Sequence, residues 1–374
     1  MPSTHDPGSL LVNARRPRTP LLVATLAASS VLALAACGGS TRAGSPDAAA
    51  STGAAGSSTG AGASDGDLVI YSGRNEKLVS GLLDQLSAAT GVTVSVRYAG
   101  SSELAAQLLE EGEATEADVF FSQDAGALGA LGKAGRLEAL DPSLGAKVVD
   151  GYAVARILWV GTSARARVIA YHPEQAPEAA QMTTIDAILD PAFKGKIGFA
   201  PSNASFHAFV TALRVTKGED GAKAWLERFR ANEPKAYDNN VAVLDGVDNG
   251  EVSLGLINHY YWFEKAAEKG ASAVTAKIRF LDSNDPGALI NVAGVGVLKG
   301  TDQKEAATKA VSFLLGPEAQ KYFAERTFEY PVVDGTPTPA GLPALTDLEG
   351  SSIDLNKLDS LDETLALLGE VGLT

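Results

Sequence analysis

The run Asn258-His259-Tyr260-Tyr261-Trp262 holds the side chains of this sequence that are best suited to bind a hard metal cation. A tyrosine phenol is normally protonated at neutral pH, because its pKa lies near 10. A trivalent cation such as Fe(III) stabilises the phenolate, so two adjacent tyrosines can supply two strong anionic oxygen ligands. Adjacent aromatic residues after an apolar strand are also common packing groups. The pair alone therefore leaves a metal site and an aromatic strand end as open alternatives.

The N-terminal residues 1–36 have the layout of a secretion signal. Arg15, Arg16 and Arg18 precede a short apolar stretch that is too short to span a bilayer comfortably. The ending Leu34-Ala35-Ala36-Cys37 resembles the lipobox of bacterial lipoproteins, which implies cleavage before Cys37 and lipid attachment to it. We therefore expect the protein on the extracytoplasmic face of the cell membrane, in the periplasm if the envelope is Gram-negative.

Composition narrows the remaining possibilities. Cys37 is the only cysteine, so no disulfide can form within the chain. Residues 37–66 are almost wholly Gly, Ser, Ala and Thr, which is typical of a flexible linker. The net charge of -14 argues against a nucleic-acid partner. The remaining body of about 300 residues is long enough for two domains.

The elements that must position the tyrosines follow an α/β rhythm. Short β-branched runs alternate with helical patterns, which predicts a parallel sheet with helices on both faces. Strands are expected at residues 68–71, 92–96, 117–121, 157–160, 168–171, 197–200, 253–257, 278–281 and 292–297. In open α/β sheets ligands bind beyond the carboxyl ends of strands. The loops after Tyr71, Phe121, Ala200 and Ile257 are therefore the expected site, and all four are polar.

Several segments together resemble the ferric-ion-binding proteins of bacterial ABC importers, a transferrin-like group of solute-binding proteins. The resemblance extends from about Leu68 to Val333 and is carried by the following runs: Ile70-Tyr71-Ser72-Gly73, Ala117-Asp118-Val119-Phe120-Phe121, Ala164-Arg165-Ala166-Arg167-Val168, Asn249-Gly250-Glu251-Val252, Asn258-His259-Tyr260-Tyr261-Trp262 and Glu329-Tyr330-Pro331-Val332. It implies a two-lobed periplasmic-binding-protein fold with an interlobe ligand cleft. We expect a first lobe at 67–165 plus 291–341 and a second at 166–290 plus 342–374.

The resemblance implies that Tyr260 and Tyr261 are the main iron ligands. A subgroup of the family adds a histidine and a glutamate from the first lobe, and Asn75 and Gln123 stand at those positions here. Amides are poor Fe(III) ligands, so we expect weak or water-mediated contacts from both. Asp124 is the alternative carboxylate if the register of its loop differs.

Two phenolates leave one positive charge on Fe(III), so an exogenous anion such as phosphate, carbonate or citrate is expected with water in the remaining positions. The resemblance assigns an anion-binding role to the following residues: Asn203, Ala204, Ser205, Asn240 and Asn258. Free N–H groups at a helix N-terminus attract anions, although Asn203 or Ser205 could equally be an ordinary helix cap.

Other polar residues have weaker prospects. His259 is expected to be structural, because its side chain would point away from Asn258 and Tyr260 in a strand. His172 and His207 are expected at the surface or in packing, and Glu76 and Glu103 are minor candidates. Arg165 is expected at the surface, with pairing to an acidic group or to the anion as the alternative.

The leading interpretation is a monomeric, lipid-anchored receptor that presents Fe(III) and an anion to an ABC permease. A binding protein for an organic anion such as a sugar phosphate, without metal, is the first alternative. An enzyme or adhesion lipoprotein is the second, but the sequence contains no nucleophile elbow, Cys/His cluster or phosphate-binding glycine loop.

Overall fold

The computed structural model describes residues 66–149, 157–348 and 355–374, which belong to one unit from Ala61 to Thr374. The predicted signal peptide, Cys37 and nearly all of the linker lie outside the described residues. No helix in the described ranges is long and apolar enough to cross a membrane.

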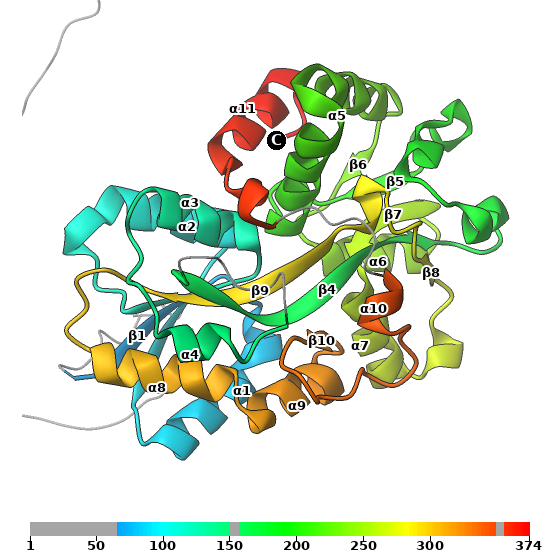
Figure 1. Cartoon of the computed structure of the whole chain (residues 1–374). Coiled ribbons are helices and arrows are strands. Elements are labelled where there is room, and N and C mark those ends of the chain that lie inside the picture. Colours follow the sequence, from blue (N-terminus) through cyan, green and yellow to red (C-terminus); the bar gives the residue numbers. More distant parts are fainter. Residues whose placement is uncertain (1–65, 150–156, 349–354) are drawn as a thin grey trace, which may run out of the picture. The chain divides into compact units, whose positions relative to one another are not determined.

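The described chain alternates strands and helices, as the sequence pattern predicts (Figure 1). The strands are β1 (Leu68–Ser72), β2 (Val94–Tyr98), β3 (Val119–Ser122), β4 (Trp159–Tyr171), β5 (Ile197–Phe199), β6 (Lys235–Ala236), β7 (Leu254–Asn258), β8 (Lys277–Arg279), β9 (Ile290–Val297) and β10 (Tyr330–Pro331). The α-helices are α1 (Glu76–Thr90), α2 (Ser101–Glu111), α3 (Ala125–Lys133), α4 (Pro142–Gly145), α5 (Ala204–Ala231), α6 (Asn240–Asp248), α7 (His259–Lys269), α8 (Lys304–Leu314), α9 (Pro317–Arg326), α10 (Leu345–Leu348) and α11 (Leu361–Val371).

The strands form a mixed sheet in the order β2-β1-β3-β9-β4-β7-β5-β6, with β8 and β10 also paired to β4. The predicted parallel pairing is correct for β1 with β2 and β3, and for β5 with β6 and β7. It is wrong for β4 and β9, which pair antiparallel to each other and to their other neighbours. These two strands connect elements that are distant in sequence, so the local strand-helix rhythm does not set their direction.

Strand β4 also corrects the prediction of two separate strands at 157–160 and 168–171. The structure has one strand of 13 residues, from Trp159 to Tyr171. Its first part pairs with β9 and its last part with β7 and β8. Arg165 and Arg167 interrupt the apolar pattern in the middle of the strand. The pattern alone therefore predicts a break between two strands at this point.

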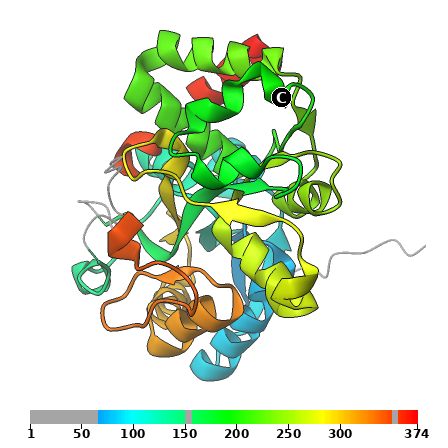
Figure 2. The same ribbon diagram turned by 90° about the vertical axis from the view of Figure 1, so that its right-hand side faces the viewer.

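Strand β4 passes between hydrophobic clusters that account for most of the buried apolar surface. The first cluster contains the apolar residues of β1, β3 and β9 and those of β4 up to Ala166. Beyond this point Ile169 lies in a second cluster, on one face of the sheet, and Val168 lies in a third, on the other face. Helices α5 and α11 cover the second cluster and lie side by side in Figures 1 and 2.

The C-terminal segment belongs to two clusters in turn. Leu355 and Leu358 pack into the first cluster, beside α3, whereas Leu367 and Leu368 of α11 pack into the second cluster, against α5. The segment 342–374, expected in the second lobe, thus has described residues in both clusters, since Leu342, Leu345 and Leu348 also pack against the first cluster.

The helices that follow β1, β3 and β5 each begin with a side-chain cap. Asn75 Oδ1 accepts from the Lys77 N–H at 3.0 Å, and Asp124 Oδ1 accepts from the Ala127 N–H at 3.1 Å. Asn203 caps α5 in the same way. Polar residues at these strand ends therefore have a structural role in starting the helices, whatever else they bind.

Candidate metal and anion site

Tyr260 and Tyr261 lie in the first turn of α7, directly after β7. The prediction that this run continues a strand is wrong, because Asn258 is the N-cap and the helix begins at His259. The rings of Tyr260 and Tyr261 are 4.2 Å apart between centroids, and the side chains are 1% and 6% exposed. Both are therefore held against each other in a buried position rather than spread along a strand.

Burial determines the protonation of the tyrosine pair. It is the main cause that raises the pKa of Tyr260 well above its ordinary value, with the neighbouring Tyr261 and Glu329 as further causes. Burial likewise raises the pKa of Tyr261. Without a bound cation both phenols keep their protons. A phenolate at this site therefore requires a strong positive charge nearby, and Arg165 and Arg74 already act in that direction on Tyr260.

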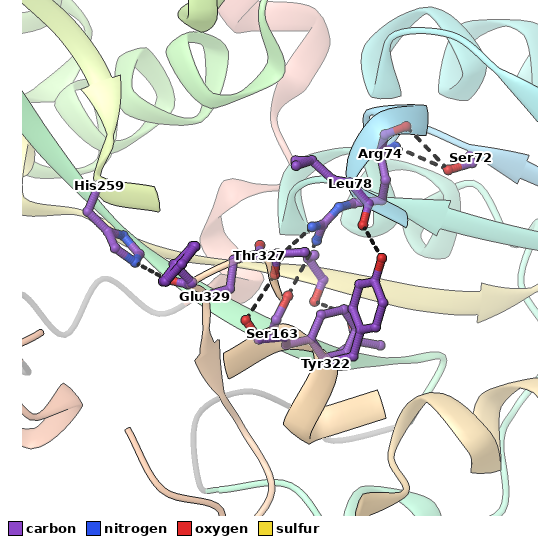
Figure 3. Close-up of polar contacts among 12 residues, drawn as sticks. Ser72, Arg74, Leu78, Ser163, His259, Tyr322, Thr327 and Glu329 are labelled. Atoms are coloured by element: carbon purple, nitrogen blue, oxygen red, sulfur yellow. Dashed lines mark hydrogen bonds and ion pairs between the residues drawn. The ribbon is translucent and has the colours of Figure 1, made fainter. Parts of the chain in front are cut away.

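Three buried arginines lie in this region, and two of them, Arg74 and Arg165, act electrostatically on Tyr260. Arg74 follows β1, and Arg165 and Arg167 lie on the same face of β4. Arg74 donates to Glu329 Oε2 and, at 3.3 Å, to Ser163 Oγ, as Figure 3 shows. Arg167 donates to the Ser205 carbonyl at 2.9 Å. Burial, with Arg165 as a second cause, lowers the pKa of Arg167 to about 9.

Arg165 corrects the expectation of a surface arginine. It is 1% exposed, and none of its three guanidinium nitrogens has a hydrogen-bond partner in the described structure. Burial lowers its pKa, although Tyr260, Glu329 and Asp124 act in the opposite direction. A buried guanidinium with free N–H groups has the chemistry to receive an oxyanion.

Four of the five residues assigned to anion binding lie together at the N-terminus of α5, where Ala204 is the first helical residue and Asn240 contacts Ser205. Asn203 Oδ1 accepts from the Ser205 N–H at 3.0 Å and from the Ser205 hydroxyl at 2.7 Å. Asn240 Nδ2 donates to Ser205 Oγ at 3.1 Å. Asn258 is 2% exposed, and its Nδ2 has no partner in the described structure.

The first-lobe residues Asn75 and Gln123 differ in their surroundings. Asn75 is exposed and caps α1, whereas Gln123 is 7% exposed and its Nε2 has no partner among the described residues. Asp124 caps α3 through Oδ1, while its buried Oδ2 has no partner there. Burial raises the pKa of Asp124, and Arg165 lowers it.

A pocket of about 870 Å³ lies beside Tyr261. Asn75 and Glu76 at the start of α1 line it together with Tyr261 and Glu264 of α7. Within the described residues, no three His, Cys, Asp or Glu side chains gather as a group that could hold a metal ion.

The remaining candidates have structural partners. His259 is fully buried: its Nδ1 accepts from the Ala166 N–H at 3.1 Å and its Nε2 faces the Phe328 carbonyl at 2.8 Å. Burial is the main cause that lowers the pKa of His259 to about 4. His207 is buried and bridges Ser102 and the Pro201 carbonyl. His172 and Glu103 lie outside the pocket.

Sequence reasoning did not single out Arg74, Arg167, Glu264 or Glu329 as site residues. Arg165 and Arg167 had a usable signal, because two arginines two positions apart in an apolar strand point to the same face. The burial of Glu264 and Glu329 had none, since each is a single acidic residue among polar neighbours.

Comparison with known proteins agrees with the fold and with the family resemblance. Residues 114–349 match the model of the family described as bacterial extracellular solute-binding protein. The chain is 33% identical over 310 residues to the Fe(3+)-binding periplasmic protein of Serratia marcescens, covering 83% of this chain and 91% of that protein. The crystal structure of iron-bound HitA from Pseudomonas aeruginosa is 32% identical, with a TM-score of 0.77, covering 82% of this chain and 99% of that one.

A Trichodesmium protein in complex with iron and citrate is 30% identical, with a TM-score of 0.67, covering 83% of this chain and 100% of that one. The fold and its polar cleft thus define a two-lobed solute-binding protein. The chain belongs to the family of bacterial extracellular solute-binding proteins. The α/β fold class and the resemblance to ferric-ion-binding proteins predicted from the sequence are both confirmed.

Proposed function

We propose that this protein captures Fe(III), together with a small oxyanion, in the interlobe cleft and delivers the iron to an ABC permease. The observation that carries the proposal is the buried, contacting pair Tyr260 and Tyr261 at the start of α7, with Tyr261 lining a pocket. Arg165 and Asn258 are also buried and have polar atoms without partners in the described structure. Relatives that bind Fe(III) support the same cargo.

Tyr260 and Tyr261 would ligate the ion as phenolates, with Asn75 and Gln123 as weak or water-mediated contacts. Ionisation of the two phenols releases two protons, and their burial makes it unfavourable until the cation arrives. This arrangement favours a trivalent cation over a divalent one, because only the higher charge offsets the energy of ionising both phenols.

The anion would bind between the N-terminus of α5 and the arginines of β4. Polar atoms on one side would come from the backbone of Asn203, Ala204 and Ser205 and from the side chains of Asn240 and Asn258. Free N–H groups on the other side would come from Arg165. Phosphate, carbonate and citrate all have the required oxygens. The Trichodesmium complex with iron and citrate supports an anion of this class.

The test is the colour of the protein, because iron phenolates absorb visible light. Purified protein given Fe(III) with phosphate or citrate should turn orange to red, and the Tyr260→Phe/Tyr261→Phe double variant should stay colourless while keeping its aromatic packing. Tyr330→Phe is the matched control, since its hydroxyl donates to the Pro343 carbonyl outside the pocket. A colourless wild type that binds a sugar phosphate would replace this proposal with the metal-free alternative.

We further propose a monomeric, non-catalytic receptor that is attached to the membrane through a lipid on Cys37. The lipobox-like ending Leu34-Ala35-Ala36-Cys37 supports the attachment. Cys37→Ala should move the protein from the membrane fraction to the soluble fraction of the producing cells. An unchanged membrane fraction would contradict the anchor without affecting the iron site.

A further inference from the structure

Glu264 is a carboxylate of the pocket with no ion-pair partner in the described structure. It lies half-buried on α7 and lines the same pocket as Tyr261 and Asn75. Its Oε1 is buried without a hydrogen-bond partner among the described residues. An unpaired carboxylate in such a position is costly unless a cation joins it.

The helix places Glu264 beside the tyrosine pair. Residues three and four positions apart share one face of an α-helix, so Glu264 follows Tyr260 and Tyr261 on that face by one turn. Side chains of a helix lean toward its N-terminus, which brings the carboxylate back over the tyrosine turn. Consistent with this closeness, the charge of Glu264 contributes to the raised pKa of Tyr261.

Glu264 forms an ion pair with none of the described lysines and arginines, and two of its neighbours are engaged elsewhere. Lys265 pairs with Asp245 and Asp248 at 2.7 and 2.6 Å, and Arg74 pairs with Glu329. Burial, followed by the charge of Glu329, raises the pKa of Glu264 to about 8, which is the behaviour of a carboxyl group that lacks a counter-charge. Glu264 is therefore a carboxyl group that largely keeps its proton at neutral pH until a cation enters the pocket.

We infer that Glu264 is a third anionic protein ligand for the Fe(III) cargo, and that it takes the place left by the neutral first-lobe residues Asn75 and Gln123. The inference rests on the proposed iron-binding function. Two phenolates and one carboxylate carry three negative charges, which match the charge of Fe(III). The exogenous anion would then balance the positive charge of the buried Arg165 rather than that of the metal ion.

The test compares Glu264→Gln with Glu268→Gln, using Fe(III) supplied as ferric citrate. Glu268 is exposed and lines the same pocket one helical turn further on, so it controls for a general change of charge. We expect Glu264→Gln to lower the Fe(III) affinity by more than the roughly 10–100-fold that loss of an outer-shell partner typically causes. Glu268→Gln should stay within about threefold of wild type by comparison with exposed charges.

The absorption band provides a readout that a purely structural role would leave unchanged. Replacing a carboxylate ligand by a weaker donor makes Fe(III) a stronger electron acceptor, so the phenolate-to-iron band should move to longer wavelength in Glu264→Gln. The thermal unfolding temperature of the metal-free variant at neutral pH should stay close to that of wild type, because a protonated carboxyl group and an amide are both neutral.

An unmoved band in Glu264→Gln would overturn the inference, whether or not the affinity falls, because the carboxylate would then act only through its field. A wild type that fails to bind Fe(III) would instead defeat the proposed function. The tyrosine double variant separates the two cases, since its loss of colour depends on the phenolates alone.

Discussion

Arg165 carries a buried positive charge without a hydrogen-bond partner among the described residues. We expect Arg165→Gln to change the free energy of unfolding of the ligand-free protein by no more than about 1 kcal/mol, because an unsatisfied charge is lost along with its attractions. In the presence of phosphate the same variant should bind Fe(III) about 10–100-fold more weakly, as expected for loss of a hydrogen bond to a charged group of roughly 1.5–3 kcal/mol. Iron titrations with and without phosphate measure both effects.

Arg97→Gln is the matched control, since Arg97 is an exposed arginine of β2 that stacks on the Tyr71 ring. It should leave the response to phosphate unchanged. If Arg165→Gln weakens iron binding equally with and without phosphate, the guanidinium contacts no anion and the assignment fails.

Individual site residues differ in how far the sequence predicts their role. Tyr260 and Tyr261 are adjacent in the sequence, so the sequence alone indicates that both phenols could bind one cation. The burial of Arg165 and Glu264 depends on which elements pack around them, and polar type alone favours the surface. The amide cap of Asn203 was readable as an alternative, and the structure contains it.

At the scale of elements, helix α5 begins with a histidine contact that should depend on pH. His207 Nε2 lies 2.8 Å from the Pro201 carbonyl, so it carries the proton, and Nδ1 accepts from the Ser102 hydroxyl of α2 at 3.0 Å. Burial lowers the pKa of His207 below its ordinary value. The folded state therefore binds fewer protons than the unfolded state around that value, and the stability from neutral His207 is lost as the pH falls through about 6.5.

His207→Gln should accordingly lower the free energy of unfolding by about 1 kcal/mol at pH 7.5, the typical net value of a lost hydrogen bond. The difference from wild type should shrink toward pH 5, because only wild type must keep a buried imidazole neutral. Urea unfolding at several pH values measures this difference. The contribution of His259 to the pH dependence cancels, because His259 is present in both proteins. A difference that stays constant with pH would show that His207 does not titrate on unfolding.

The elements differ in how well local pattern predicts them. Helix α1 and strands β1 and β3 match their apolar patterns closely, because the apolar residues of each pack in a single cluster. Strand β4 changes its neighbours midway and contains two arginines, so its continuity depends on pairing with β9 and β7. The start of α7 at His259 depends on the extended backbone of Asn258, which apolar periodicity does not show.

At the scale of the whole described unit, β4 and β9 connect the first cluster to the part of the sheet that carries the tyrosines. Few backbone connections between two lobes permit a hinge, and Arg165 and Arg167 lie where β4 changes from one cluster to the next. The Ser102 hydroxyl and His207 already join α2 to α5 across this division. Ligand bound between the lobes would add contacts to both.

We therefore expect Fe(III) with phosphate to reduce the radius of gyration of the protein, as measured by small-angle X-ray scattering. Binding should also stabilise both lobes together, by about 2.7 kcal/mol at a free ligand concentration of 100 times the dissociation constant. The Tyr260→Phe/Tyr261→Phe variant is the control, since the proposed site cannot then supply phenolates. If the variant contracts as much as wild type, closure follows from the anion alone. If wild type binds iron without contracting, the lobes do not close about β4 and β9. The permease would then have to recognise the loaded protein by another change.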